Sequence, residues 1–336
     1  MQQAMTVRSV NATESRAFSI LRVFAILSVI AAHVNRVVEM PAIRGAISAF
    51  WNAFGQVGVI CFFLMGGFFY HRERGDTKSF WQKKLTSLII PWIFCSIVTF
   101  ALNALSARRF SVLAYVKWVL GSGTWYYYIT VFLVFLVIFK WLARRDAWLY
   151  LCMVLNIASL ALCTVKPDWL SLPFLTQYLN VFNWIGFFAL GILMRKYRLD
   201  RAILSRWWSI PIAAVAAIAS LAYHMHGFLT YFHLVTPIFE LSAFVLLLWA
   251  SNALAKTRVA APLAFLGGTT YCIYLLHMQI VQTICRLLPQ TASIDIINPF
   301  IGLTVMAVAV TVGLKICQLL PFGKVICTLV GLRAKK

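Results

Sequence analysis

Charged residues are scarce in this chain. Only 12% of its 336 residues are charged and only nine are acidic, whereas 62% are hydrophobic and 15% are aromatic. An average soluble domain carries about 25% charged residues. One oversized core cannot hide so many apolar residues, because single cores stop growing beyond about 250 to 300 residues. The composition therefore excludes an ordinary soluble protein and predicts one that is embedded in a membrane.

Paired cysteine motifs are missing as well. The eight cysteines almost all fall within apolar runs, and none forms a CxxC pair or stands near a histidine at the spacing of metal ligands. This distribution is typical of cysteines that serve as small apolar packing residues. We therefore expect neither a disulfide framework nor a bound metal.

Long apolar runs are abundant instead. A transmembrane helix needs about 20 predominantly apolar residues. Ten runs of this kind cover residues 18–38, 48–70, 86–106, 124–143, 147–164, 178–194, 208–225, 229–250, 264–288 and 298–320. Several are apolar on every face, unlike the alternating strands of a transmembrane barrel. The sequence predicts an all-α, polytopic transmembrane bundle of about ten helices. Residues 1–336 would form a single domain, with a short N-terminal segment (1–17) and a C-terminal tail (321–336).

The basic residues predict the orientation of this bundle. With ten spans, 21 of the 30 Lys and Arg residues fall on the face that carries both termini and 6 on the other, while Arg22, Arg286 and Lys315 lie within spans. Because cytoplasmic loops collect Lys and Arg, both termini are predicted to lie in the cytoplasm. The net charge of +21 then needs no nucleic-acid partner to explain it.

Two ionisable side chains share one face of the first predicted span. Arg22 and His33 are eleven residues apart, which is close to three helical turns, or about 16 Å along the axis. Arg22 would lie near the cytoplasmic mouth, where a permanent cation can hold an anionic group. His33 would be buried beyond the middle of the span, where an imidazole can move a proton. The alternative is a buried pair that only holds neighbouring helices together.

Glu240 and His277 are the other ionisable groups near mid-membrane depth. Glu240 is the only acidic residue in any predicted span. A lone carboxylate inside the membrane is more often half of a structural ion pair than a catalytic group. We therefore expect Glu240 to pair with a residue such as Arg22 or Arg286. His277 would make a hydrogen bond across a helix interface. We also treat both residues as candidates for substrate binding.

Several motifs follow the order in which they occur in a known family. The first is Arg22, ten residues and His33 in the first predicted helix. Later ones are residues 58–68 (GVICFFLMGGF), 83–92 (KKLTSLIIPW), 124–126 (TWY), 187–191 (FFALG) and 266–277 (LGGTTYCIYLLH). From about residue 14 to the last helix, the sequence resembles the acyltransferase 3 family of integral membrane acyltransferases.

The resemblance implies transfer of an acyl group, usually acetyl, from cytosolic acyl-CoA to a hydroxyl of a carbohydrate or lipid-linked glycan. Such enzymes modify surface polysaccharides from the cytoplasmic (inner) membrane of bacteria. Acetyl-CoA would be a co-substrate, and no metal would be needed. Arg22 and His33 are then the expected catalytic residues. His33 would either take the proton from the acceptor hydroxyl or carry the acyl group transiently.

The remaining site residues bind the donor and the acceptor in this interpretation. Arg and Lys clusters favour phosphates, so the CoA phosphates are expected to meet Arg22, Lys83, Lys84, Arg72 and Arg74. Trp125 and Tyr126 would offer an aromatic platform to a sugar ring, although aromatic residues at span ends are more often anchors at the membrane interface.

Two other functions compete with acyl transfer. A carrier or flippase for an envelope glycan precursor would use the buried histidines and Glu240 as a proton relay. The sequence has no inverted-repeat signal and no matched pair of broken helices, which counts against this alternative. A non-catalytic membrane partner in polysaccharide assembly would leave Arg22 and His33 without a chemical role.

Overall fold

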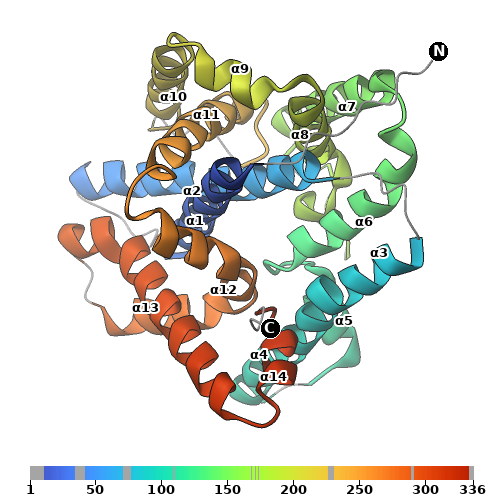
Figure 1. Cartoon of the computed structure of the whole chain (residues 1–336), viewed down its shortest axis with the longest axis vertical. Helices are drawn as coiled ribbons and strands as arrows, with labels where there is room; N and C mark the ends of the chain where they lie inside the picture. The colour runs from blue at the N-terminus through green and yellow to red at the C-terminus, as the bar shows by residue number, and fades with distance from the viewer. Residues whose placement is uncertain are drawn as a thin grey trace.

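The computed structural model describes residues 11–34, 42–70, 77–108, 110–167, 169–170, 172, 174–225, 231–288 and 291–332, and within them it is helical with no β-strand. The α-helices are α1 (Ala12–Val34), α2 (Ala42–Phe68), α3 (Thr77–Lys84), α4 (Ile90–Ala107), α5 (Val112–Leu120), α6 (Tyr127–Leu142), α7 (Asp146–Val165), α8 (Ile185–Tyr197), α9 (Leu199–Ser205), α10 (Ser209–Met225), α11 (Thr236–Leu254), α12 (Ala260–Leu287), α13 (Ala292–Leu319) and α14 (Gly323–Leu329). Figure 1 shows α1 near the middle of the bundle, with α2, α11 and α12 beside it.

Each of the ten predicted spans overlaps one of these helices: α1, α2, α4, α6, α7, α8, α10, α11, α12 and α13. In the described part of the chain, seven segments are long and apolar enough to cross a membrane, or eight if the bent pair α9 and α10 is one span. The helix α6, with 16 residues, and α8, with 13, are shorter. The predicted all-α transmembrane bundle is confirmed, whereas its orientation stays a prediction. The predicted turn near Gly227 lies outside the described residues.

The largest difference from the predicted spans lies at residues 178–194. Two 3₁₀ turns, η2 (Gln177–Leu179) and η3 (Val181–Asn183), occupy its first part, and α8 begins only at Ile185. Asparagine side chains compete with a helix for backbone hydrogen bonds. The Asn180 side chain accepts from Phe182 N at 3.1 Å and donates to Ser159 Oγ of α7 at 3.0 Å. This buried polar network breaks the predicted helix.

The junction of α3 and α4 contains a π-helical turn, η1 (Leu85–Ile89). The Ile90 N–H bonds the Leu85 carbonyl five residues back, and Pro91, which has no N–H, follows directly. A π turn adds one residue to a helical turn and is frequent at functional sites. It leads from the basic residues at the end of α3 into the apolar helix α4.

The central helix α1 approaches its neighbours closely through glycines. A Cβ at Gly267 of α12 would overlap the backbone carbonyl of Ser19, and one at Gly58 of α2 would overlap that of Ala25. Small residues allow membrane helices to bring their backbones together in this way. The Ser28 hydroxyl adds a polar bond, because it accepts from Gly58 N at 2.7 Å. The position of α1 is therefore fixed by backbone contacts on two sides.

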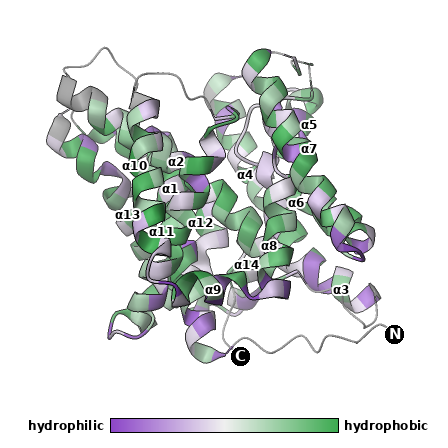
Figure 2. Ribbon diagram, turned by 90° about the horizontal axis from the view of Figure 1, so that it is seen from above, coloured by the Kyte–Doolittle hydropathy of each residue, from purple (hydrophilic) through white to green (hydrophobic). Residues whose placement is uncertain are grey.

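Two arginines, Arg201 of α9 and Arg195 of α8, contact the first turn of α1 and the end of α2, respectively, and Arg195 donates to the Phe68 carbonyl at 3.2 Å. Asn11 and Glu14 form a capping box that starts α1, and Glu14 pairs with Arg201 of α9 at 3.1 Å. We call this the basic end of the bundle. Figure 2 shows α3, α9 and α14 along this edge, with hydrophilic segments.

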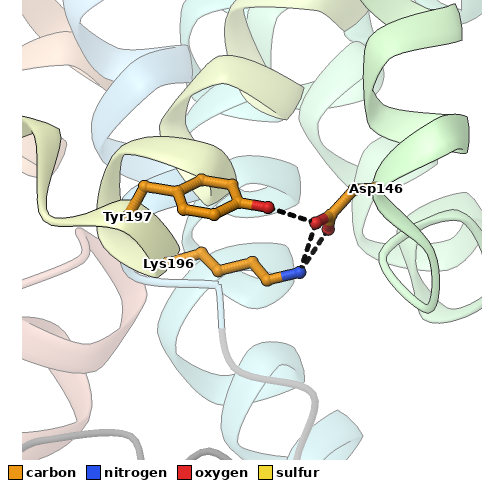
Figure 3. Close-up of polar contacts among 3 residues, drawn as sticks. All are labelled: Asp146, Lys196 and Tyr197. Atoms are coloured by element: carbon orange, nitrogen blue, oxygen red, sulfur yellow. Dashed lines mark hydrogen bonds and ion pairs between the residues drawn. The ribbon is translucent and has the colours of Figure 1, made fainter.

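An ion pair joins α7 to α8 at the surface. Lys196 Nζ lies 2.5 Å from Asp146 Oδ1, and the Tyr197 hydroxyl donates to the same carboxylate (Figure 3). Asp146 stands in the first turn of α7, where a negative charge also favours the helix dipole. Because both charged groups are partly exposed, the pair contributes only about 0–1 kcal/mol.

Candidate active site

A cavity of about 420 Å³ opens beside Arg22. Three of the predicted donor-binding residues line it together: Arg22 from α1 and Lys83 and Lys84 from the end of α3. Its other lining residues are mostly aromatic or apolar: Phe62, Met65, Gly66, Phe69, Tyr70, Phe80, Ser87, Tyr128, Phe132 and Leu136. We call it the aromatic arm. It combines cations with an apolar interior.

A second cavity of about 850 Å³ shares Arg22, Lys84, Ser87 and Phe132 with the aromatic arm. Its remaining wall comes from α12 and from the chain beyond α13. These residues are Thr86, Leu88, Gly267, Gly268, Thr270, Tyr271, Lys324, Thr328, Gly331 and Leu332. We call it the tail arm. Its basic residue Lys324 lies in the predicted C-terminal tail (321–336) and was not a site candidate from the sequence.

Part of the predicted C-terminal tail, up to Leu332, packs against the bundle. Cys327 and Leu332 pack with Cys272 of α12, and the Cys95 thiol of α4 contacts the Leu329 carbonyl. These contacts place α14 against α4 and α12. The sequence offered a hint in the apolar residues of 325–332, a stretch too short for a span.

The guanidinium of Arg22 faces aromatic rings. Its Cζ lies 5.5 Å from the centroid of the Phe69 ring, a cation–π distance, and Tyr128 interacts with it electrostatically. The side chain is half-buried. Arg22 thus stands where the two arms meet, as a permanent cation at the entrance to an apolar space.

His33 lies near the far end of α1, where its ring meets that of His277 from α12. The two centroids are 5.1 Å apart with an interplanar angle of 41°. His277 is fully buried, whereas His33 is exposed. The predicted depth of His33 in the membrane stays a prediction. His33 is the last residue but one of α1.

The backbone fixes the tautomer of His277. Its Nδ1 lies 2.6 Å from the Tyr274 carbonyl oxygen. A carbonyl only accepts hydrogen bonds, so Nδ1 carries the proton. Nε2 is then an acceptor, and it has no hydrogen-bond partner among the described residues. A buried acceptor without a partner is costly. The pair of imidazoles can therefore take part in proton transfer, with one ring accessible and the other held in a fixed form.

Of the two predicted aromatic platform residues, only Trp125 contacts this histidine pair. Its ring centroid lies 5.9 Å from that of His277, and its Nε1 has no partner in the described part of the chain. Tyr126 is fully buried, with its hydroxyl 3.0 Å from Thr99 Oγ1 and 3.2 Å from the Leu275 carbonyl. The Tyr126 hydroxyl thus bonds α4 and α12, and its role in substrate binding stays a prediction.

A row of rings connects the aromatic arm to the histidine pair. Tyr128, which lines the arm, lies 5.6 Å from Tyr274, and Tyr274 lies 5.7 Å from His277. The Tyr274 hydroxyl donates to the Trp125 carbonyl. Arg22 lines the aromatic arm together with Tyr128 of α6, and His33 contacts His277 of α12, so both residues of α1 lie beside this row of rings. Tyr274 lies within the motif at residues 266–277, whereas nothing in the sequence pointed to Tyr128.

Comparison with known proteins assigns the chain to a family. The sequence profile of the acyltransferase 3 family, described as an acyltransferase domain, matches residues 16–316. The chain belongs to the acyltransferase 3 family. It is therefore a multi-pass membrane acyltransferase, as the motifs predicted. No curated protein and no solved structure shows a significant match to it.

Glu240 of this acyltransferase lies elsewhere in the bundle. The carboxyl is buried, and it interacts electrostatically with Cys61, Tyr127 and Tyr231. No ion pair joins it to Arg22, Arg286 or any other residue that the structure describes. The expected ion pair is therefore wrong, because α11 turns this side chain towards a cluster of tyrosines. The structure does not bring Glu240 to the histidine pair.

The remaining predicted site residues of the acyltransferase are Arg72 and Arg74, which lie outside the described residues. All eight cysteines are free thiols. The described residues contain no group of three or more side chains that could hold a metal ion.

Proposed function

We propose that this acyltransferase moves an acetyl group from acetyl-CoA, bound at the basic end, to a hydroxyl of a carbohydrate or lipid-linked glycan at His33. One observation carries the proposal: a cavity lined by Arg22, Lys83 and Lys84 and an imidazole pair lie along the same stripe of α1. A CoA thioester has a polyanionic head and a long reactive arm. It fits a basic entrance that leads into an apolar interior.

The donor's phosphates pair with the cations, and its pantetheine arm follows the aromatic arm towards Tyr128. The Tyr274 ring contacts both the Tyr128 ring and the His277 ring. In this proposal, a turn of the Tyr274 ring gives the thioester carbonyl access to the histidine pair. The aromatic walls exclude water along the way, which protects the thioester from hydrolysis.

His33 acts as the general base in this scheme. Its imidazole accepts the proton of the acceptor hydroxyl while the hydroxyl oxygen attacks the thioester carbonyl carbon. The C–S bond then breaks, and the proton passes to the CoA thiolate. The Nε2 of His277 accepts a hydrogen bond from the protonated His33 and stabilises it. Trp125 Nε1, which also lacks a partner, donates to the acceptor or to the developing oxyanion.

The predicted orientation directs this reaction across the membrane. With both termini in the cytoplasm, the basic end receives cytosolic acetyl-CoA and His33 lies towards the outer face. A bacterial cytoplasmic membrane supplies the donor on one side and glycan precursors on the other. Modification of an envelope polysaccharide is the role that this arrangement suits.

The test uses membranes that contain the protein together with the lipid-linked glycans of its host. They are incubated with radiolabelled acetyl-CoA, and label is sought on glycan. The wild type should transfer label and His33→Ala should not, at equal membrane abundance. If label stays on the protein in membranes without acceptor, and is absent from the His33→Ala variant, His33 carries the acyl group as an acyl-histidine and is not a general base. Uptake of a glycan precursor without any covalent label would refute acyl transfer and favour a carrier.

A further inference from the structure

The tail arm has no assigned occupant, although it is the larger of the two cavities, with about 850 Å³ against 420 Å³. It carries Arg22, Lys84 and Lys324, and no acidic side chain lines it within the described residues. Lys324 is exposed and pairs with no acidic residue that the structure describes. A cavity lined by three cations and by no acidic side chain among the described residues is suited to a ligand with several negative charges.

The walls of the tail arm also leave room for a flat group. Gly267 and Gly268 of α12 lie side by side in its wall, and a Cβ at Gly268 would meet no atom within 4 Å. The ring of Tyr271 lines the same space, with its hydroxyl donating to the Leu88 carbonyl at 2.6 Å. This aromatic ring, held in place by its hydroxyl in the wall of the tail arm, is suited to contact with a heterocyclic base.

We propose that the tail arm binds the nucleotide end of the CoA thioester, with Lys324 pairing with its 3′-phosphate. This inference rests on the proposed acetyl-CoA donor. The diphosphate then lies between Arg22 and Lys84, which line both arms. The pantetheine chain turns from there into the aromatic arm, whose cation Lys83 is absent from the tail arm's lining. Because the two arms share Arg22 and Lys84, one bent ligand can place its nucleotide end in the tail arm and its pantetheine end in the aromatic arm.

The assignment gives the chain beyond α13 a direct part in donor recognition. Lys324 belongs to α14, which packs against α4 and α12 through Cys327 and the Leu329 carbonyl. A lysine on a helix packed in this way presents its charge at a defined place. Selection of CoA over donors without a 3′-phosphate would therefore depend on a residue far in sequence from the first-helix motif.

The experiment measures the discrimination between CoA and dephospho-CoA, which lacks only the 3′-phosphate. The full-length protein in nanodiscs of zwitterionic lipid is titrated with each compound, and the ratio of the two dissociation constants is taken. The wild type should prefer CoA by about tenfold or more, the value of a charge-assisted hydrogen bond. Lys324→Ala should bring the ratio close to one, and Lys324→Arg should restore most of it.

Two other lysines give matched controls. Lys315→Ala removes an exposed lysine of α13 that lines neither arm, and the ratio should stay at the wild-type value. Lys83→Ala, in the aromatic arm, should weaken CoA and dephospho-CoA by the same factor. Repeating the titration in nanodiscs with anionic lipid separates a lipid headgroup from the nucleotide, because competing lipid weakens both compounds equally.

Each outcome decides the assignment. A ratio that collapses only in Lys324→Ala supports it. A wild type without discrimination, or a Lys324→Ala variant that keeps it or weakens both compounds equally, overturns it while leaving acetyl-CoA as the donor. If the wild type binds neither compound and transfers no acetyl group from acetyl-CoA, the proposed function fails as well.

Discussion

The imidazole of His33 and that of His277 face each other with their centroids 5.1 Å apart, although 244 positions separate them in the chain. One ring is exposed, and the other is fully buried with its Nδ1 2.6 Å from a backbone carbonyl. The difference in environment suggests a division of roles. In the proposed mechanism the exposed ring exchanges protons with a substrate, and the buried ring holds it in position.

Replacing His33 by alanine should reduce acetyl transfer by about 100- to 10,000-fold, the usual contribution of a general acid–base group. Binding of acetyl-CoA should stay within a few-fold of wild type, because Arg22 and the lysines remain. Transfer is measured with labelled donor at matched membrane abundance. A His33→Ala variant with full activity would remove this residue from the mechanism.

Replacing His277 by asparagine tests the positioning role. The asparagine Nδ2 can still donate to the Tyr274 carbonyl, whereas the acceptor Nε2 is lost. We expect kcat to fall at least tenfold with little change in the KM for acetyl-CoA, since His277 lines neither arm of the proposed donor site. The matched variant His277→Gln, which approximates the position of Nε2, should recover part of the rate. Equal loss in both variants, together with lower thermal stability, would indicate a purely structural histidine.

Adjacent glycines of α12 offer a test of the α1–α12 contact. Gly267→Ala should destabilise the protein by about 1–3 kcal/mol, because the new methyl group overlaps the Ser19 carbonyl and overpacking costs that much. Gly268→Ala, whose methyl group meets open space, should be neutral or slightly stabilising. Thermal unfolding in detergent compares the two. Equal melting temperatures would mean that the backbones do not approach this closely.

Removing the charge of Lys84 should weaken CoA binding by about tenfold, because this lysine lines both arms. The affinity should also become less sensitive to salt, since fewer charges are then screened. Lys78→Ala, on the same helix but outside both linings, is the control and should behave as wild type. Unchanged CoA affinity in Lys84→Ala would move the donor site away from α3.

The sequence predicted the helices far better than the contacts between them. Apolar runs of membrane length predict transmembrane helices without reference to their packing, and each predicted span overlaps a helix. The exception at residues 178–194 arose because Asn180 and Asn183 bond neighbouring groups instead of continuing a helix. Hydropathy alone does not register such side-chain competition.

The candidate site was predictable where one helix carries the information. Arg22 and His33 share α1, so their common face follows from the helical period. The meeting of His33 with His277 depends on how α12 packs on α1, and the position of Lys324 depends on how α14 packs on α12. Those placements follow from close backbone approach at Gly267 and from small apolar contacts such as Cys272 with Cys327. A pattern in one sequence does not show which residues of different helices pack together.

The backbone contact between Ser19 and Gly267 has a consequence for biogenesis. The ribosome delivers α1 first and α12 only after most of the other helices have been inserted. During that interval Arg22 and His33 lack the helix that later covers their stripe, and a polar stripe exposed to lipid is unfavourable. Early association of α1 with α2, through Gly58 and Ser28, would retain the helix in the bilayer until its late partner arrives.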